Sequence, residues 1–351
     1  MRLLRDLLRS AVDAGAVPGA AALVGQGEEV EVASAGELEP ASLVRIASVT
    51  KPITAVAVML LVDDGRVALD DAIARWLPEL ASPQVVRTPH SALDDLVSAR
   101  RPITVEDLLT FRAGWGFPSD FSLPAAIELF EKLPLFGPRE TPDEWLATLA
   151  RVPMLRQPGE AWLYNTCSDI QGVLVARVSA QPLPVFLAER LFEPLGMSDT
   201  SFRVPAEKLA RLSPYHGSIE EAVWTEPPLF PSGAGGLVST LADLHRFGRM
   251  LLRHGGGLLS PRSVRLIMTD HLTPEQREAS TLFLEGAGWG FGGAVAADGR
   301  YGWVGGTGTT AHVAPSTDTV GVLLTQLQMT GPTPTKFMRE FWRYAFAAPP
   351  S

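Results

Sequence analysis

The chain has 351 residues, of which 46% are hydrophobic and 20% charged, and its formal net charge is −9. This balance is typical of a globular protein that buries a substantial core, and the negative charge argues against a nucleic-acid partner. The single cysteine, Cys167, cannot form an internal disulfide, so nothing in the sequence requires an oxidising compartment.

Neither the N-terminus nor any apolar run predicts a membrane segment. Residues 1–20, MRLLRDLLRSAVDAGAVPGA, mix leucines with charges at helical spacing and are unlike a secretory signal. The apolar run AVAVMLLV, residues 55–62, is far shorter than the roughly 20 residues that cross a bilayer. We therefore expect a cytoplasmic protein with no membrane partner.

The first expected elements are a helix and a strand pair. An amphipathic helix is predicted over residues 2–14, followed by strands GAAALVG (19–25) and EEVEVASAG (28–36). The next helix follows Ser48 and ends at Gly65, because glycine is a favoured C-terminal cap.

From residue 69 to about residue 220 the patterns are mostly helical, and Thr104 is an expected helix N-cap. After the amphipathic stretch TLADLHRFGRMLLRHGG the chain returns to strand patterns, and TKFMREFWRYAFAA predicts a final helix. We predict one α/β sheet domain built from residues 1–75 and 221–351. A mainly helical domain over residues 76–220 is inserted in it, and an active site lies between the two.

Ser48 and Lys51 lie three residues apart at the expected start of a helix, so their side chains share one face. Lysine is rare here, with four among 30 basic residues, and unlike arginine it can lose its proton when desolvated. The apolar run behind Lys51 would lower its pKa and let it accept the Ser48 proton. The pattern predicts a serine–lysine nucleophile, although the tetrapeptide alone also fits a capping serine followed by a surface lysine.

The context of this pair, RIASVTKPITAVAVMLLVDDGRVALDDAIARWLPEL, resembles the serine β-lactamase and penicillin-binding-protein superfamily. The resemblance is to its class C β-lactamase and family VIII carboxylesterase branch. Three later stretches agree in order: ITVEDLLTFRAGWG, FEPLGMSDTSF and GAGGLVSTLADLHRFGRMLL. The resemblance implies an α+β, β-lactamase-like fold, in which helices flank an antiparallel sheet and a mainly helical domain is inserted.

The second family motif, a tyrosine followed two residues later by asparagine, matches PGEAWLYNTCSDIQG at Tyr164. By resemblance Tyr164 relays protons between Ser48, Lys51 and the leaving group. Thr166 stands where the family has asparagine, so it takes that substrate-binding position without an amide.

The third family motif, Lys-Thr-Gly or His-x-Gly, aligns with Trp303, Val304 and Gly305 in YGWVGGTGTT. By resemblance Trp303 and Gly305 contact substrate. The backbone N–H groups of Ser48 and Gly306 would form the oxyanion hole.

Three other candidate site residues are considered. By resemblance, Trp115 and Phe117, in the loop after LLTF, are expected to wall the acyl pocket. His312 follows the third motif closely enough to line the substrate site, and a structural role is the alternative that its position favours. Cys167 is expected to be a small core residue. The histidines form no metal-ligand pair such as His-Glu-x-x-His, so we expect neither a metal nor a cofactor.

These observations predict a serine carboxylesterase that acts on short-chain esters through an acyl-enzyme. The same machinery would serve a β-lactamase, a D-amino-acid amidase or peptidase, or an acyltransferase, and the substrate in each case is a small ester or amide. The alternative outside enzymes is a binding or scaffold homologue without turnover. The sequence gives no indication of the oligomeric state.

Overall fold

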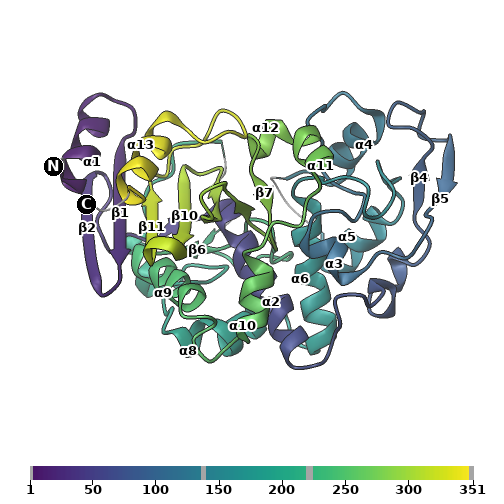
Figure 1. The fold of residues 1–351 in the computed structure, drawn as a ribbon, viewed down its shortest axis with the longest axis horizontal. Helices are drawn as coiled ribbons and strands as arrows, with labels where there is room; N and C mark the ends of the chain where they lie inside the picture. The colour runs from purple at the N-terminus through teal and green to yellow at the C-terminus, as the bar shows by residue number, and fades with distance from the viewer. Residues whose placement is uncertain (1–2, 136–139, 219–223, 348–351) are drawn as a thin grey trace.

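The computed structural model describes residues 3–135, 140–218 and 224–347. Its main sheet has seven strands in the order β2-β1-β11-β10-β9-β8-β7, and neighbouring strands pair antiparallel (Figure 1). The strands are β1 (Gly19–Gln26), β2 (Glu29–Gly36), β7 (Gly288–Trp289), β8 (Ala294–Val295), β9 (Tyr301–Gly305), β10 (Thr309–Ala314) and β11 (Thr319–Leu324). The sheet is therefore built from segments near both ends of the chain, and the expected α+β class is confirmed.

Helices cover both faces of the sheet. The ideal Cβ position of Gly248, in α9 (Leu241–Leu252), lies 2.7 Å from Val320 of β11. The next residue of β11 is Gly321, and its ideal Cβ position lies 2.7 Å from the ring of Phe346. Phe346 directly follows α13 (Lys336–Ala345). Because successive strand residues face opposite sides, α9 and α13 lie on opposite faces of the sheet. All six residues of β11 are buried as a result.

The helix α1 (Leu4–Asp13) packs on β1 and β2 and contacts α13. Most of the remaining helices gather at the other end of the molecule from β2 or below the sheet (Figure 1). The remaining helices are α2 (Thr50–Asp63), α3 (Val105–Leu109), α4 (Pro124–Lys132), α5 (Pro142–Leu149), α6 (Thr166–Ser179), α7 (Leu183–Leu187), α8 (Glu193–Leu195), α10 (Pro261–Ile267), α11 (Pro274–Ala279) and α12 (Thr281–Leu284). Two short strand pairs complete the fold, β3 (Val44–Arg45) with β6 (Val238–Ser239) and β4 (Gln84–Val86) with β5 (Leu96–Ser98).

Across residues 3–135, 140–218 and 224–347, no single helix has the length and hydropathy needed to span a bilayer. The segments Thr166–Ser179 and Leu183–Leu195 meet that test only when taken together, and they are bent by 81° relative to one another.

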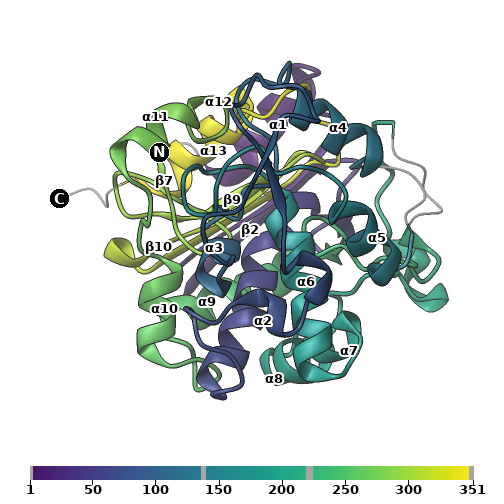
Figure 2. The ribbon, with the colours of Figure 1, turned by 90° about the vertical axis from the view of Figure 1, so that its right-hand side faces the viewer.

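The central helix of the fold is α2, which packs against α6 (Figure 2). Every residue from Thr50 to Leu61 is buried, as the apolar run on all sides of this helix predicts. The helix ends at Asp63, and Gly65 adopts a left-handed φ of 69°, which glycine accepts without strain. A single 3₁₀ turn, Ala47–Val49, leads into α2 and carries Ser48.

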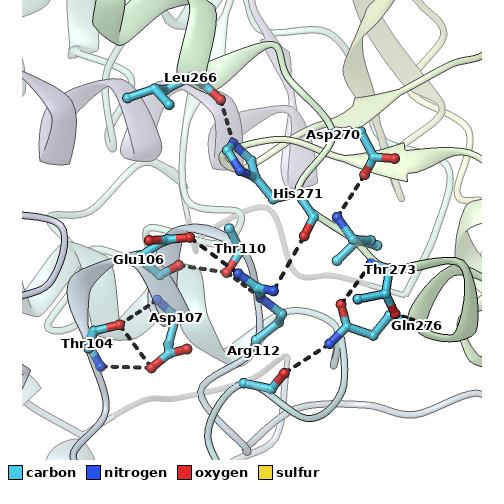
Figure 3. Close-up of polar contacts among 12 residues, drawn as sticks. Thr104, Glu106, Asp107, Thr110, Arg112, Leu266, Asp270, His271, Thr273 and Gln276 are labelled. Atoms are coloured by element: carbon cyan, nitrogen blue, oxygen red, sulfur yellow. Dashed lines mark hydrogen bonds and ion pairs between the residues drawn. The ribbon is translucent and has the colours of Figure 1, made fainter.

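The predicted N-cap at Thr104 is confirmed. The Thr104 hydroxyl accepts a hydrogen bond from the Asp107 N–H, and the Asp107 carboxylate accepts one from the Thr104 N–H at 2.9 Å (Figure 3). This reciprocal capping box satisfies two backbone donors at the start of α3. Arg101 adds a bidentate ion pair to the same carboxylate, at 2.5 and 2.8 Å.

The C-terminal end of β9 lies directly against the turn that carries Ser48. An ideal Cβ at Gly305 would lie 2.3 Å from the carbonyl oxygen of Ile46 and 2.2 Å from the Thr309 hydroxyl. That hydroxyl itself donates to the Ile46 carbonyl at 3.0 Å. Only glycine therefore allows this approach of strand and turn.

We expect Gly305→Ala to destabilise the protein by about 1–3 kcal/mol, since the added methyl group must displace backbone atoms. Gly306→Ala is the matched control, because an ideal Cβ at Gly306 meets no atom within 4 Å. Urea unfolding of both variants measures the difference. Equal unfolding free energies for the two variants would contradict the close-approach explanation.

Candidate active site

Ser48 and Lys51 are in direct contact. The Lys51 amine donates a hydrogen bond to the Ser48 hydroxyl oxygen at 2.8 Å, as their spacing at a helix start predicts. Lys51 is fully buried, whereas Ser48 is partly exposed. The arrangement thus joins an accessible hydroxyl to an amine that solvent does not reach.

The residue before Ser48 is held in an uncommon conformation. Ala47 has a φ of 44°, in the left-handed region that residues with a Cβ rarely adopt. Such strain persists only where surrounding contacts impose it, and it occurs often at active sites. Here the neighbouring Ile46 provides those contacts, since its N–H donates to Leu237 and its carbonyl accepts from Thr309.

A loop over residues 232–236 holds the other side of the lysine. The Lys51 amine donates to the carbonyl oxygen of Ala234 at 2.6 Å. The buried Asp169 carboxylate, on α6, accepts from the Ser232 hydroxyl at 2.6 Å and from the Ala234 N–H at 3.1 Å. Asp169 therefore fixes the loop whose carbonyl orients Lys51. The stretch GAGG carried a family resemblance, but sequence reasoning assigned no role to Ala234, Asp169 or Ser232.

Tyr164 lies over the same amine. The Lys51 nitrogen is 4.7 Å from the centre of the Tyr164 ring. The Trp303 indole N–H donates to the Tyr164 hydroxyl oxygen at 2.8 Å, and Tyr164 also forms a hydrogen bond with Ser48. Burial raises the pKa of Tyr164 to about 12, while these two hydrogen bonds act in the opposite direction. The phenol therefore stays protonated at neutral pH.

The indole nitrogen of Trp303 is bonded to Tyr164. Because an indole N–H can only donate, the Tyr164 oxygen accepts from it and keeps its own proton for a second partner. Trp303 is 5% exposed, and its ring also packs at 4.8 Å against Trp289. Its polar contact is thus with Tyr164, and substrate contact through Trp303 stays a prediction.

The peptide after Tyr164 makes a tight turn. Asn165 has φ 81° and ψ −65°, and the Thr166 N–H donates to the Tyr164 carbonyl at 3.2 Å. These are the dihedrals and the hydrogen bond of a classic γ-turn, which is rare and strained. The turn ends the extended segment of Tyr164 and starts α6 at Thr166, whose side chain is 4% exposed.

Gly305 and Gly306 follow Trp303 at the end of β9. Gly305 is buried against the Ser48 turn, while Gly306 is exposed and its carbonyl accepts from the Met329 N–H at 2.7 Å. The position of β9 against this turn suits the predicted pairing of the Ser48 and Gly306 N–H groups around one substrate oxygen. That pairing stays a prediction.

The two aromatic residues of the loop after α3 differ in their placement. Trp115 is 1% exposed, and its indole N–H donates to the Val152 carbonyl at 2.8 Å. It therefore has almost no surface to offer a substrate, which corrects the expectation that it walls the acyl pocket. Phe117 is also buried, at 3% exposed, but its backbone exchanges two 2.9 Å hydrogen bonds with that of Tyr164 and so places it beside the site. A contact of Phe117 with the acyl group stays a prediction.

His312 is not part of the site. On β10, His312 pairs with Gly302 of β9, and its neighbour Ala311 pairs with Trp303. Because successive strand residues face opposite sides, the His312 side chain lies on the face of the sheet opposite to that of Trp303. There its ring packs at 4.9 Å against Trp342 of α13 and bonds to the Thr310 hydroxyl at 2.9 Å. The expectation that His312 lines the substrate site is corrected, because the packed sheet separates it from Ser48.

Comparison with known proteins identifies the family and the fold. Residues 4–340 match the Beta-lactamase family. Protein Rv1367c of Mycobacterium tuberculosis is 36% identical over 357 residues, which cover 91% of this chain and 88% of that protein. Esterase EstB of Burkholderia gladioli is 30% identical over 280 residues, covering 72% of this chain and 66% of EstB.

The solved structure of EstCE1, a hydrolase with promiscuous acyltransferase activity, is similar in fold. It superposes with a TM-score of 0.81 over 97% of both chains, at 23% sequence identity. The β-lactamase-like fold that the sequence resemblance implied is therefore confirmed.

The buried position of His312 has a measurable consequence for acid stability. Burial, with a smaller effect of the Arg300 charge, lowers the pKa of His312 to about 3. Because an unfolded histidine titrates near pH 6.5, the unfolded chain binds a proton that the folded chain excludes. The stability from neutral His312 is thus present above about pH 6.5 and is lost as the pH falls toward 3.

We expect the unfolding free energy of His312→Gln to decline less between pH 7 and 4 than that of the unchanged protein. Urea unfolding at a series of pH values measures it, with the exposed His254→Gln as the matched control. Parallel pH dependence in all three proteins would show that His312 titrates normally.

Proposed function

Because the chain belongs to the Beta-lactamase family, which matches residues 4–340, we propose that it is a serine hydrolase that cleaves short-chain carboxylic esters through an acyl-enzyme. The observation that carries the proposal is the contact of one serine with two proton-transfer groups. The Ser48 hydroxyl bonds to the Lys51 amine at 2.8 Å and to the Tyr164 hydroxyl. A binding protein without turnover has no need of this arrangement.

The proposed reaction begins with attack by the Ser48 oxygen on the ester carbonyl. The Ser48 proton passes to Lys51, and the negative carbonyl oxygen is held by the N–H groups of Ser48 and Gly306. The bond to the alcohol oxygen then breaks, and Tyr164 donates the proton that this oxygen needs, recovering one from Lys51. Water attacks the acyl-Ser48 ester in the same way and releases the acid.

The preference for esters over β-lactams rests on charge. Trp303 stands at the first position of a motif that is basic in β-lactam-hydrolysing relatives, and it supplies a neutral N–H in place of a cation. A carboxylate-bearing β-lactam would lose a charge-assisted contact there, which weakens recognition more than losing a neutral one. An uncharged ester makes no such demand. The name of EstB, a relative at 30% identity, also supports ester hydrolysis.

The direct test compares kcat/KM for p-nitrophenyl acetate and butyrate with that for nitrocefin on one preparation. We expect the esters to be turned over faster, and we expect Ser48→Ala to abolish both turnover and fluorophosphonate labelling. A nitrocefin value that matches or exceeds the ester values would replace the esterase proposal with the β-lactamase alternative. Labelling that persists in Ser48→Ala would remove the assigned nucleophile.

The Trp303–Tyr164 hydrogen bond generates a separate prediction. Trp303→Phe keeps an aromatic ring but removes the indole N–H that donates to the Tyr164 hydroxyl, so the pKa of Tyr164 should rise further. Losing one partner of a buried hydroxyl costs about 1–3 kcal/mol, which corresponds to a fall in kcat of roughly 10- to 100-fold. Tyr164→Phe, which removes the proton donor itself, should lower kcat by about 10²–10⁴-fold and serves as the reference.

Steady-state kinetics on p-nitrophenyl acetate measure both variants. If Trp303→Phe changes KM and leaves kcat intact, Trp303 acts on substrate binding rather than on Tyr164.

A further inference from the structure

A chain of phenylalanine rings leads from Tyr164 to the protein surface. The Phe283 ring stacks on the Tyr164 ring at 4.8 Å, with 28° between their planes. Phe121 lies 6.1 Å from Phe283, and Phe117 lies 6.1 Å from Phe121 and 5.9 Å from Phe130. We call these four phenylalanines, residues 117, 121, 130 and 283, the aromatic rim.

The outer rings of the rim face solvent. Phe121 and Phe130 are each 49% exposed, and Ile127, one turn before Phe130 on α4, is 44% exposed. Leaving three large apolar side chains half exposed on neighbouring segments costs free energy, and clusters of this kind usually mark a binding surface. Phe117 and Phe283 are only 3% and 6% exposed, so Phe121 and Phe130 carry the accessible part of the rim, and Phe283 connects it to Tyr164 by ring contacts.

The rim is built from two segments that polar contacts hold together. Phe283 belongs to α12, and the Ser119 hydroxyl, two residues before Phe121 in the chain, donates to the Ala279 carbonyl at 2.8 Å. The Gln276 side-chain amide donates to the carbonyls of Gly159 and Glu160 at 2.9 and 3.1 Å.

The start of the same segment is tied to the residues that directly follow α3. The Arg112 guanidinium, which also bonds to Thr110, donates to the His271 carbonyl at 3.4 Å, and the Thr273 N–H donates to the Gln276 side chain at 3.2 Å (Figure 3). At the other end, Arg339 of α13 forms an ion pair with Glu285 at 2.6 Å. The segment that carries Phe283 is therefore fixed at several points, which suits a preformed surface for a ligand.

We propose that the aromatic rim binds the alcohol part of the substrate and selects esters of uncharged alcohols that carry a ring. This inference rests on the proposed ester hydrolysis. Tyr164 is proposed to protonate the departing alcohol oxygen, so groups that continue outward from Tyr164 lie on the alcohol side of the cleaved bond. A ring on that alcohol can stack against the exposed rings of Phe121 and Phe130, and such aromatic pairs contribute beyond their buried area.

The two sides of the ester can be separated kinetically. Esters of one acid with different alcohols form the same acyl-enzyme, so the alcohol affects acylation and has left before deacylation begins. A rim that binds the alcohol therefore changes kcat/KM, which reports acylation. A rim that binds the acyl group changes the decay rate of the acyl-enzyme as well.

The experiment uses ethyl, benzyl and 2-naphthylmethyl acetates as the alcohol series and ethyl esters of acetic, butyric and phenylacetic acids as the acyl series. The variants are Phe121→Ala and Phe130→Ala, and Leu209→Ala is the control because Leu209 is 39% exposed on a segment outside the rim. Stopped-flow measurement of acetyl-enzyme formation and decay accompanies the steady-state kinetics.

The unchanged protein should prefer the naphthylmethyl over the ethyl acetate. We expect each rim variant to reduce the naphthylmethyl-to-ethyl ratio of kcat/KM by about 5- to 10-fold, with the change confined to acetyl-enzyme formation. Leu209→Ala should leave the ratio within twofold of its original value.

Three outcomes would overturn the inference. A ratio unchanged in both rim variants means that the rim does not contact the alcohol. A loss that follows the acyl series, or appears in acetyl-enzyme decay, places the acyl group there. If the unchanged protein hydrolyses none of these esters and Ser48 is not labelled by a fluorophosphonate, the proposed function fails and the inference falls with it.

Discussion

The candidate site depends on one buried nitrogen. An amine removed from water is costly unless hydrogen-bond partners surround it, and the Lys51 amine has the Ser48 hydroxyl on one side and the Ala234 carbonyl on the other. Those partners come from the turn before α2 and from a loop about 180 residues later. The requirement to satisfy this group therefore fixes the position of the nucleophile relative to that loop.

The segments that supply hydrogen-bond partners to the Lys51 amine are held in place by further hydrogen bonds. Asp169, on α6, holds the loop through Ser232 and the Ala234 N–H. The Thr50 hydroxyl accepts from the Leu237 N–H at 3.3 Å, and the Ile46 N–H donates to the Leu237 carbonyl at 3.0 Å. The loop and the residue that follows it, Leu237, thus bond to α2, α6 and the Ser48 turn and hold the three segments in place relative to one another. A site held this way keeps its geometry before substrate arrives, which is what efficient proton transfer requires.

The aromatic residues around Tyr164 divide into two groups with different exposure. Trp162, Trp289 and Trp303 are buried; Trp162 and Trp303 pack against the Tyr164 ring at 5.7 Å, and Trp289 packs against Trp162. The rings of the aromatic rim continue from Tyr164 to solvent. In this arrangement one tryptophan, Trp303, also supplies the polar contact to Tyr164. Packing and hydrogen bonding are therefore combined in a residue that carries no charge, and the proposed preference for neutral esters follows from that.

Local features were predictable from the sequence alone, because their contacts lie within a few residues. The Ser48–Lys51 contact follows from helical spacing, the Thr104 cap from a threonine placed three residues before an aspartate, and buried α2 from an apolar run without a polar face. The strand pair β1–β2 and the final helix α13 follow from the same kind of local pattern. Tyr164 was found by its family motif, although nothing local indicates that it contacts Ser48.

The tertiary structure decided every feature that depends on contacts between distant segments. The sequence places His312 nine residues after Trp303, but the register of β9 with β10 puts the two on opposite faces, and α13 covers the face of His312. Trp115 looks equally available until the Val152 carbonyl is brought to its indole. Ala234, Asp169 and Phe283 have no local signature at all. Their roles arise from packing between elements more than 60 residues apart, and short-range patterns carry no information about that packing.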